Sequence, residues 1–364
     1  MKELKIVCPI AGVGKRLQPF TYSKPKAFLK LAGKTIIDHA MDMLMDAFPE
    51  GTEVLFIVGY KKEMIIQHIT DSYGDYFSLH FEEQEPRGVV RDIPIFPGLG
   101  HAIYIARRSG FMPENNNSHG MFVFLSDRLP IDGFEGIKEN FENHDFDGLI
   151  NVSIVDHPEH YGVVKLNEKR VITKLVEKPK EFVSKMAISG IYIFNIDAAN
   201  TVLDYLEEEV KKPIKKDKEY QFTPAIEHAV KKGFKLSVHQ MDNEILDIGR
   251  PESFLMGNKW FLDKAELDLN FFKITNANVV QPTFLGQNVV IDHAIVGPHV
   301  SVGDDCEITN TIIHDSVIGD GSSLNKVITS GSIIGDDVHL EDIIKDKITV
   351  GDRSVISTRK NGEC

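Results

Sequence analysis

Glycine recurs at a fixed short interval in the C-terminal quarter of the chain, and this period restricts the possible fold more than any other sequence feature. Gly303, Gly319, Gly335 and Gly351 follow one another every 16 residues, each after a short β-branched run. Such self-similarity is typical of a solenoid of stacked coils. The spacing favours a left-handed parallel β-helix of hexapeptide type over a series of β-hairpins. Small apolar side chains, including Cys306, are expected inside it.

The first part of the chain has a different pattern, in which apolar strands alternate with helical spacing. Residues 4–10, 54–58 and 121–125 form continuous apolar runs, and residues 35–48 and 61–73 between them have helical periodicity. Continuous apolar strands separated by helices are typical of a mostly parallel sheet covered on both faces. Ligands bind such sheets at the carboxyl ends of the strands.

Further elements are expected up to about residue 267. The expected strands are 79–81, 149–155, 162–166, 171–177 and 189–194, and the expected helices are 100–108, 198–211, 223–232 and 251–267. A length of 364 residues is too great for one ordinary core. We therefore expect an α/β domain, Rossmann-like with a mixed, mostly parallel sheet, over residues 1–268. The β-helix is expected over residues 269–364.

Composition excludes several classes of partner. The formal net charge of −13 would repel nucleic acid. No apolar run reaches the roughly 18 residues that a membrane span needs. Cys8, Cys306 and Cys364 form no closely spaced pair, so we expect neither a disulfide framework nor a zinc site, and a reducing, cytoplasmic setting fits.

A glycine-rich turn follows the first strand, and cations gather after it. Gly12 and Gly14 allow the backbone from Ala11 onward to approach a ligand closely. The cations that follow within a short stretch are Lys15, Arg16, Lys24 and Lys26. Backbone N–H groups in such a turn can hold a phosphate chain. The sequence therefore predicts a phosphate-binding site in an otherwise acidic protein.

This turn resembles the signature of the sugar-1-phosphate nucleotidyltransferase family, whose members often carry a C-terminal β-helix. The residues that match are Ala11, Gly12, Gly14, Arg16, Leu17, Pro25 and Lys26. Lys15 departs from the threonine that is usual there. The resemblance implies that Ala11, Gly12, Gly14 and Lys15 bind nucleotide, that Arg16 contacts the leaving β- and γ-phosphates, and that Lys26 contacts the α-phosphate.

Two further motifs imply a metal site. The apolar strand before Asp127 resembles the family strand that ends in G-D-x-L, and Asp247-Ile-Gly-Arg-Pro-Glu252 resembles its D-I-G-T-P-E motif. Oxygen ligands at a strand's carboxyl end suit Mg²⁺ beside phosphates. By this resemblance Asp127 and Asp247 hold Mg²⁺ between them.

Sugar-side motifs lie in the second half of this region. Tyr161-Gly-Val-Val164 and Val176-Glu-Lys-Pro179 resemble the family's Y-G-V-V and E-K-P motifs, and the strand through Gly190 resembles another sugar-contacting strand. The resemblance assigns Tyr161, Gly162, Glu177 and Gly190 to the sugar. It assigns Lys178 to the phosphate of the sugar.

Base recognition is implied by a split motif. Gln84 begins a Q-x-E-P-x-G-like stretch, and Gly98-Leu-Gly100-His-Ala completes it after an insertion that includes residues 89–97. In the family a glutamine and a nearby glycine backbone read uracil or thymine. Gln84 and Gly100 can meet here if the insertion loops out, since closure entropy grows slowly with length. The expected substrates are UTP or dTTP and glucose 1-phosphate.

Two other functions remain open at this point. A silent regulatory or scaffold homologue is suggested by the substitutions at Lys15, Ser126, Pro224 and Arg250. An additional acyltransferase activity is suggested by the β-helix, although no looped-out insertion marks a coenzyme A channel. The solenoid is expected to serve assembly of a homo-oligomer or regulation, because an exposed end coil leaves strand edges for a partner.

Overall fold

The computed structural model describes residues 3–113, 119–213, 218–240, 245–264 and 273–358. The chain forms two compact units, and each unit takes two separate stretches of sequence. Residues 1–13 and 40–246 form the first unit, and residues 14–39 and 247–364 form the second. The expected domain boundary at residues 268 and 269 lies outside the described residues, so division at that point stays a prediction.

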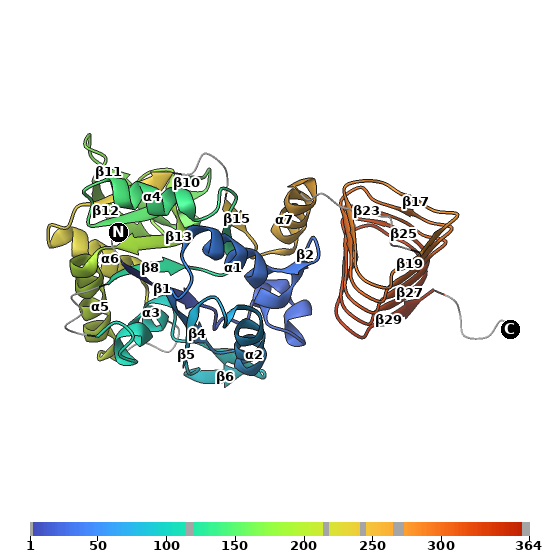
Figure 1. Cartoon of the computed structure of the whole chain (residues 1–364), viewed down its shortest axis with the longest axis horizontal. Coiled ribbons are helices and arrows are strands. Elements are labelled where there is room, and N and C mark those ends of the chain that lie inside the picture. Colours follow the sequence, from blue (N-terminus) through green and yellow to red (C-terminus); the bar gives the residue numbers. More distant parts are fainter. Residues whose placement is uncertain (1–2, 114–118, 214–217, 241–244, 265–272, 359–364) are drawn as a thin grey trace. The chain divides into compact units, whose positions relative to one another are not determined.

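A mixed nine-stranded sheet is the centre of the first unit (Figure 1). Its strands are β1 (Leu4–Pro9), β4 (Glu53–Val58), β5 (Ser78–Glu83), β8 (Gly120–Phe124), β10 (Gly148–Ile154), β11 (Gly162–Leu166), β12 (Ile172–Glu177), β13 (Met186–Phe194) and β14 (Leu236–Gln240). The main path is β12-β11-β13-β8-β1-β4-β5, and β10 pairs with β13 and β14. β1 is parallel to β4 and β8, whereas β13 is antiparallel to β8, β10 and β11. This arrangement confirms the expected α/β fold class.

Helices cover this sheet. They are α2 (Lys62–Tyr73), α3 (Leu99–Arg108), α4 (Glu135–Asn143), α5 (Ile196–Val210) and α6 (Thr223–Lys231), with the short η4 (Pro158–His160); α1 (Ile36–Ala47) begins in the second unit. Ala102, Leu203 and Ile226 from α3, α5 and α6 share one buried core with strand residues such as Val123. Burial on both faces explains why the central strands are continuously apolar. None of the described helices is both long and apolar enough to cross a bilayer.

Several elements were absent from the sequence-based expectation. α4 buries only Ile137 and Phe141, which is too sparse a pattern to predict a helix. β14 is a short edge partner of β10. Residues within the insertion form a small antiparallel hairpin of β6 (Gly88–Val90) and β7 (Ile93–Ile95). β9 (Arg128–Pro130) pairs with β15 (Ile245–Asp247).

A three-sided parallel β-helix dominates the second unit (Figure 1). Its nine-stranded sheet contains β16 (Lys273–Thr275), β17 (Asn278–Val279), β19 (Val290–Asp292), β20 (Ile295–Val296), β22 (Glu307–Thr309), β23 (Ile312–His314), β25 (Ser323–Ser330), β27 (His339–Ile344) and β29 (Val355–Ser357). Its five-stranded sheet contains β18 (Thr283–Leu285), β21 (Val300–Val302), β24 (Val317–Ile318), β26 (Ile333–Ile334) and β28 (Thr349–Val350). The predicted solenoid is confirmed, and its form agrees with the left-handed type.

The glycine period follows from the stacking of these coils. In register, Glu307 pairs with Ser323, which pairs with His339, so one coil takes 16 residues there. A Cβ added to Gly319 would lie 2.3 Å from Asp336 Oδ1 and 2.5 Å from the carbonyl carbon of Gly335. Only glycine leaves room for the next coil at this point. Cys306 is buried in the core as expected, and burial raises its pKa to about 12.

The remaining elements of the second unit precede the β-helix in sequence. They are η1 (Lys15–Leu17), η2 (Phe20–Tyr22), η3 (Lys26–Phe28), β2 (Lys30–Leu31), β3 (Lys34–Thr35) and α7 (Pro251–Lys264). The last three residues of the helix expected at 251–267 lie outside the described residues. The backbone N–H of Ala32 donates to Asn258 Oδ1 at 2.9 Å, and the His39 ring stacks on Phe261. Residues 14–39 therefore pack on α7.

Replacement of Gly319 by alanine should destabilise the β-helix. The added methyl group would overlap the backbone and carboxylate of the next coil, and overpacking of this kind costs about 1–3 kcal/mol. Urea unfolding followed by circular dichroism measures the change. Gly88→Ala is the matched control, because a Cβ there would meet no atom within 4 Å. Equal stability of the two variants would contradict the role of glycine in coil stacking.

Candidate functional site

The turn after β1 lies at the carboxyl edge of the first unit's sheet. The backbone N–H of Ile10 donates to Ile57 O at 2.9 Å, and the N–H of Tyr60 donates to Ala11 O at 3.1 Å. The chain therefore leaves β1 beside the end of β4. Ala11 is buried, whereas Gly12 is exposed, and a Cβ at Gly12 would meet no atom within 4 Å. Among the described residues, therefore, no side chain or backbone atom fills the position of a Cβ at Gly12.

Asp127 lies at the same edge of the sheet. It follows β8, which is parallel to β1, and it comes directly before β9. Burial raises the pKa of the Cys8 thiol well above its usual range, and the charge of Asp127 adds to this rise. The carboxylate is thus close to the end of β1. A hard oxygen donor in this position suits Mg²⁺. Within the described ranges, no three His, Cys, Asp or Glu side chains group together as a metal site.

Gly14 opens the cationic stretch and needs to be glycine. Its φ of 70° is left-handed, and a Cβ there would lie 2.9 Å from Lys26 Cβ and 3.1 Å from Thr21 Cγ2. The Thr21 hydroxyl also donates to Gly14 O at 3.3 Å. The turn is therefore packed directly against the stem of Lys26. Lys15 and Arg16 follow in η1, where both are exposed.

Arg16 and Asp247 both lie near Gly249 in the second unit, although more than 200 residues of sequence separate them. Both lie beside Gly249: a Cβ added there would be 2.9 Å from Asp247 Oδ1 and 3.8 Å from Arg16 Nη1. The N–H of Gly249 also donates to Asp247 O at 2.8 Å, which makes a tight turn. The missing side chain of Gly249 leaves room for the guanidinium and the carboxylate on the same side of the turn.

The two halves of the split motif come together in the first unit. The Gln84 side chain is buried, and its Nε2 donates to Gly98 O at 2.9 Å and lies 3.4 Å from His101 Nδ1. The β6–β7 hairpin takes up the inserted residues and brings the chain back. Gly98 and Gly100 must be small, because an added Cβ would lie 2.7 Å from Glu219 Cβ or from Gln221 O. The insertion therefore does not separate Gln84 from the turn at Gly100.

Glu177 is the centre of the polar cluster formed by β11, β12 and α6. The Thr223 hydroxyl donates to Glu177 Oε2 at 2.6 Å. A Cβ at Gly162 would lie 3.0 Å from that same oxygen and 3.1 Å from Thr223 Oγ1. Gly162 thus lets the carboxylate and hydroxyl lie against the strand. Thr223 was not predicted as a site residue, although it directly precedes the substituted position Pro224.

Arg128 joins this cluster from β9. Its guanidinium lies 5.9 Å from the centre of the Tyr161 ring, close enough for a cation–π contact. Burial and the charge of Glu177 raise the pKa of Tyr192, and the charge of Arg128 acts against this rise. Gly190, with a φ of 86°, leaves space for the Arg128 stem, since a Cβ there would lie 3.1 Å from Arg128 Cγ. Arg128 is a second residue that the sequence reasoning missed, although it directly follows Asp127.

Lys178 has an unusual backbone and an exposed side chain. Its φ is 44°, a left-handed value that is uncommon for a residue with a side chain. Its N–H donates to Tyr161 O at 3.0 Å, and its Nζ lies 4.0 Å from Glu177 Oε1. Strained backbone of this kind is concentrated at functional sites. Lys178 thus borders the Glu177 cluster.

The candidate residues are divided between the two units. The first unit holds Ala11, Gly12, Gln84, Gly100, Asp127, Tyr161, Gly162, Glu177, Lys178 and Gly190, and the second holds Gly14, Lys15, Arg16, Lys26 and Asp247. Within each unit the predicted residues gather into local clusters. Their roles toward a ligand stay predictions.

Several known proteins are similar to this chain in sequence. The family model described as nucleotidyl transferase matches residues 10–264. The Haloferax volcanii UTP–glucose-1-phosphate uridylyltransferase AglF is 29% identical over 68% of this chain and 93% of its own. The catalytic subunit beta of Drosophila melanogaster mannose-1-phosphate guanylyltransferase is 30% identical over 82% of this chain and 70% of its own.

A solved structure supports the same fold. The Bacillus anthracis protein, described as a glucose-1-phosphate thymidylyltransferase, superposes with a TM-score of 0.56. It covers 73% of this chain and 97% of its own length at 22% identity. At this identity the likeness shows the fold and no more.

The His101 imidazole should titrate below its usual pKa of 6.5. Burial lowers this pKa, and the charge of Arg108 lowers it further. A lowered pKa keeps His101 neutral at pH 7, with Nδ1 able to accept from Gln84. The stability that neutral His101 contributes is then lost as the pH falls below the pKa of the unfolded chain. Histidine NMR measures the titration, with His101→Gln to assign the signal. A native midpoint no lower than that of the urea-unfolded protein would contradict this expectation.

Proposed function

Because the chain belongs to the nucleotidyl transferase family, we propose that it transfers a nucleotidyl group from a nucleoside triphosphate to a sugar 1-phosphate. The position of both Arg16 and Asp247 beside Gly249 carries this proposal. It joins a cation of the glycine-rich turn to a carboxylate of a distant motif, as a site for a metal-bound polyphosphate requires. A glycine-rich turn with several cations and carboxylates suits phosphoryl chemistry.

The reaction needs no covalent intermediate with the protein. A phosphate oxygen of the sugar 1-phosphate attacks the α-phosphorus of the triphosphate. The new bond joins that oxygen to the α-phosphorus, and the bond from the α-phosphorus to the bridging oxygen breaks, so that pyrophosphate leaves. Both reactants are anions, and catalysis therefore depends on positioning and neutralisation of charge.

Cations supply that neutralisation in the proposed mechanism. Arg16 binds the β- and γ-phosphates and stabilises the charge of the leaving pyrophosphate. Lys26, held by its contact with Gly14, binds the α-phosphate. Lys178 orients the attacking phosphate, and its place beside Glu177 and Tyr161 supports this role.

Mg²⁺ is the proposed metal, and Asp127 and Asp247 would hold it. Two carboxylates with substrate phosphates form the oxygen donor set that Mg²⁺ prefers. When bound, the ion would neutralise charge on the phosphates. β9, which begins directly after Asp127, pairs with β15, which ends at Asp247.

UTP or dTTP is the proposed nucleotide, and glucose 1-phosphate is the proposed sugar substrate. The buried Gln84 amide beside the Gly98–Gly100 turn supports recognition of a uracil or thymine edge, since an amide can both donate and accept. AglF, named for UTP and glucose 1-phosphate, supports the same choice. Glu177 and Thr223 would bind sugar hydroxyls, and the backbone at Gly162 and Gly190 would allow the sugar to approach.

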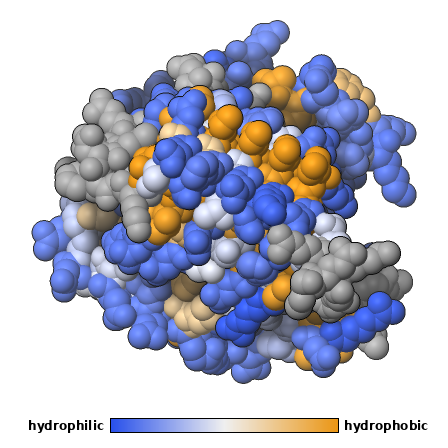
Figure 2. Space-filling view, turned by 90° about the vertical axis from the view of Figure 1, so that its right-hand side faces the viewer, coloured by the Kyte–Doolittle hydropathy of each residue, from blue (hydrophilic) through white to orange (hydrophobic). Residues whose placement is uncertain are grey.

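We also propose that the chain forms a homo-oligomer through its β-helix. Ile295, Ile312, Ile328 and Ile344 are exposed and stack in register on neighbouring coils. Figure 2 shows a row of hydrophobic side chains on the face of the molecule that it draws. A contiguous apolar stripe of this kind is typical of interaction surfaces.

The free thiols of Cys8 and Cys306 support a reducing, cytoplasmic setting.

Arg16→Ala should reduce turnover at least about a hundredfold, because loss of one preorganised charge costs on the order of 3 kcal/mol in the transition state. Pyrophosphate release in the presence of Mg²⁺ measures turnover, and circular dichroism checks the fold. Lys212→Ala removes an equal charge from an exposed position after α5 and serves as control. Near-normal turnover of folded Arg16→Ala would remove Arg16 from the mechanism.

A panel of ATP, GTP, CTP, UTP and dTTP against common sugar 1-phosphates tests the substrates. We expect kcat/KM for UTP or dTTP with glucose 1-phosphate to exceed that for the other combinations at least about tenfold, because a polar site rejects a base that leaves its groups unpaired. Pyrophosphate release is again the readout. A preference for GTP and mannose 1-phosphate would overturn the base assignment, and inactivity toward all five would support the silent homologue.

A further inference from the structure

Four aspartates form a column along one corner of the β-helix, and we name this column the aspartate ladder. Its members are Asp304, Asp320, Asp336 and Asp352, each directly after a glycine of the repeat. Oδ1 of each member accepts a backbone N–H from the preceding coil: from Gln287 at 2.7 Å, from Asp304 at 3.0 Å, from Asp320 at 3.2 Å and from Asp336 at 2.8 Å. One oxygen of each carboxylate is therefore part of the fold.

The other carboxylate oxygens bind two lysines from residues 14–39. Lys30 Nζ lies 2.7 Å from Asp320 Oδ2 and 3.5 Å from Asp304 Oδ2. Lys24 Nζ forms an ion pair with Asp336 and lies 3.5 Å from Asp352 Oδ2. Each lysine thus bridges two neighbouring coils. Like charges stacked one coil apart would repel one another, and the two lysines offset this repulsion.

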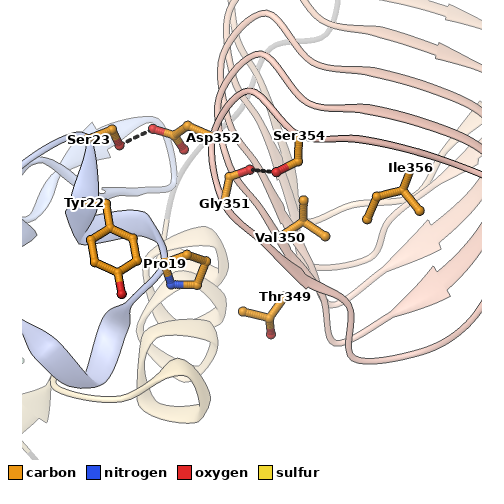
Figure 3. Close-up of a pocket in the computed structure, with 9 residues that line it drawn as sticks. All are labelled: Pro19, Tyr22, Ser23, Thr349, Val350, Gly351, Asp352, Ser354 and Ile356. Carbon is orange, nitrogen blue, oxygen red and sulfur yellow. Dashed lines mark hydrogen bonds between the residues drawn. The ribbon is translucent and has the colours of Figure 1, made fainter.

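The C-terminal end of the ladder, at Asp352, makes further contacts with residues 14–39. The Ser23 hydroxyl donates to Asp352, as the dashed line in Figure 3 shows. Pro19 lies against Gly351, where an added Cβ would be 2.9 Å from Pro19 Cβ. An open pocket of about 440 Å³ lies beside these contacts, and Tyr22 and Thr349 are among its lining residues. The last coil is thus packed against the η2 region.

The ion pairs of Lys24 are partly withdrawn from water, whereas those of Lys30 are more exposed. The side chain of Lys24 is 17% exposed, and that of Asp352 is 9% exposed. Burial raises the pKa of Asp336, and Lys24 acts against this rise. Loss of one partner of a Lys24 pair would leave a poorly solvated charge, so breaking this pair costs more than breaking an ordinary surface pair.

We propose that the aspartate ladder positions the phosphate-binding segment, residues 14–39, for nucleotide binding, with Lys24 and Lys30 as positioning residues. This inference rests on the proposed function of Arg16 and Lys26. It gives the β-helix a direct part in holding the triphosphate, beyond assembly of subunits. The ligand class concerned is a nucleoside triphosphate.

A short and stiff connection links the ladder to the proposed phosphate ligands. Only Pro25, with its fixed φ, separates Lys24 from Lys26. Lys26 in turn packs against Gly14, which precedes the turn that contains Arg16. Movement of Lys24 would therefore be transmitted to both cations. A displacement of about 1 Å at a positioning residue can cost a hundredfold in rate.

The test is the double variant Asp336→Asn with Asp352→Asn in the full chain. Asparagine keeps an oxygen for the backbone N–H of the preceding coil and removes the charge that Lys24 binds. Asp342→Asn is the matched control, because Asp342 lies on the β-helix outside the ladder and faces Lys326. Amide hydrogen exchange of residues 14–33 without substrate is the first readout. Steady-state kinetics with the active triphosphate is the second.

We expect faster exchange over residues 14–33 in the double variant and a rise of about tenfold or more in KM for the triphosphate, with a smaller change in kcat. Lys24→Met should give the same effects, and combining it with the double variant should add little, because the changes act on one interaction. Unchanged exchange, or an unchanged KM despite faster exchange, would overturn the inference. A wild type inactive with every triphosphate would refute the proposed function and the catalytic part of this inference together.

Discussion

Hydrogen bonds between successive coils, from a backbone N–H to an aspartate oxygen, organise the second unit. Each needs a glycine directly before the residue that donates the N–H, because a Cβ on that glycine would overlap the carboxylate of the next coil. The same contact that stacks the coils thereby aligns four carboxylates in one column. Lys24 and Lys30 bind this column, so the packing of residues 14–39 depends on the period of the solenoid.

The proposed chemistry is divided between the two units. The first unit contributes the strand ends with Asp127, the Gln84 turn and the Glu177 cluster, which suit a metal, a base and a sugar. The second unit contributes Arg16, Lys26 and Asp247, and Lys178 belongs to the first unit. In the proposed reaction, Arg16 and Lys26 of the second unit neutralise charge on the phosphates. Contacts that hold residues 14–39 therefore have consequences for catalysis.

Local pattern was sufficient for elements with strong periodicity. The central strands were predicted because burial on both faces makes them continuously apolar, as in β8. α4 and β14 were missed, since two buried residues or a short edge strand leave little signal. At the site, the resemblance supplied Glu177 and Gln84. It did not supply Thr223 or Arg128, whose importance appears only through their contacts with Glu177 and Tyr161.

The sequence by itself determined the solenoid, the alternating α/β region and the cationic turn, because each depends on neighbouring residues or on a regular period. Only the tertiary structure decided that residues 14–39 fold with the C-terminal part of the chain. That decision depends on contacts such as Lys24 with Asp336, which are 312 residues apart in sequence. The sequence around a single lysine does not indicate which residue it pairs with. The column of carboxylates that binds Lys24 forms only when the coils stack.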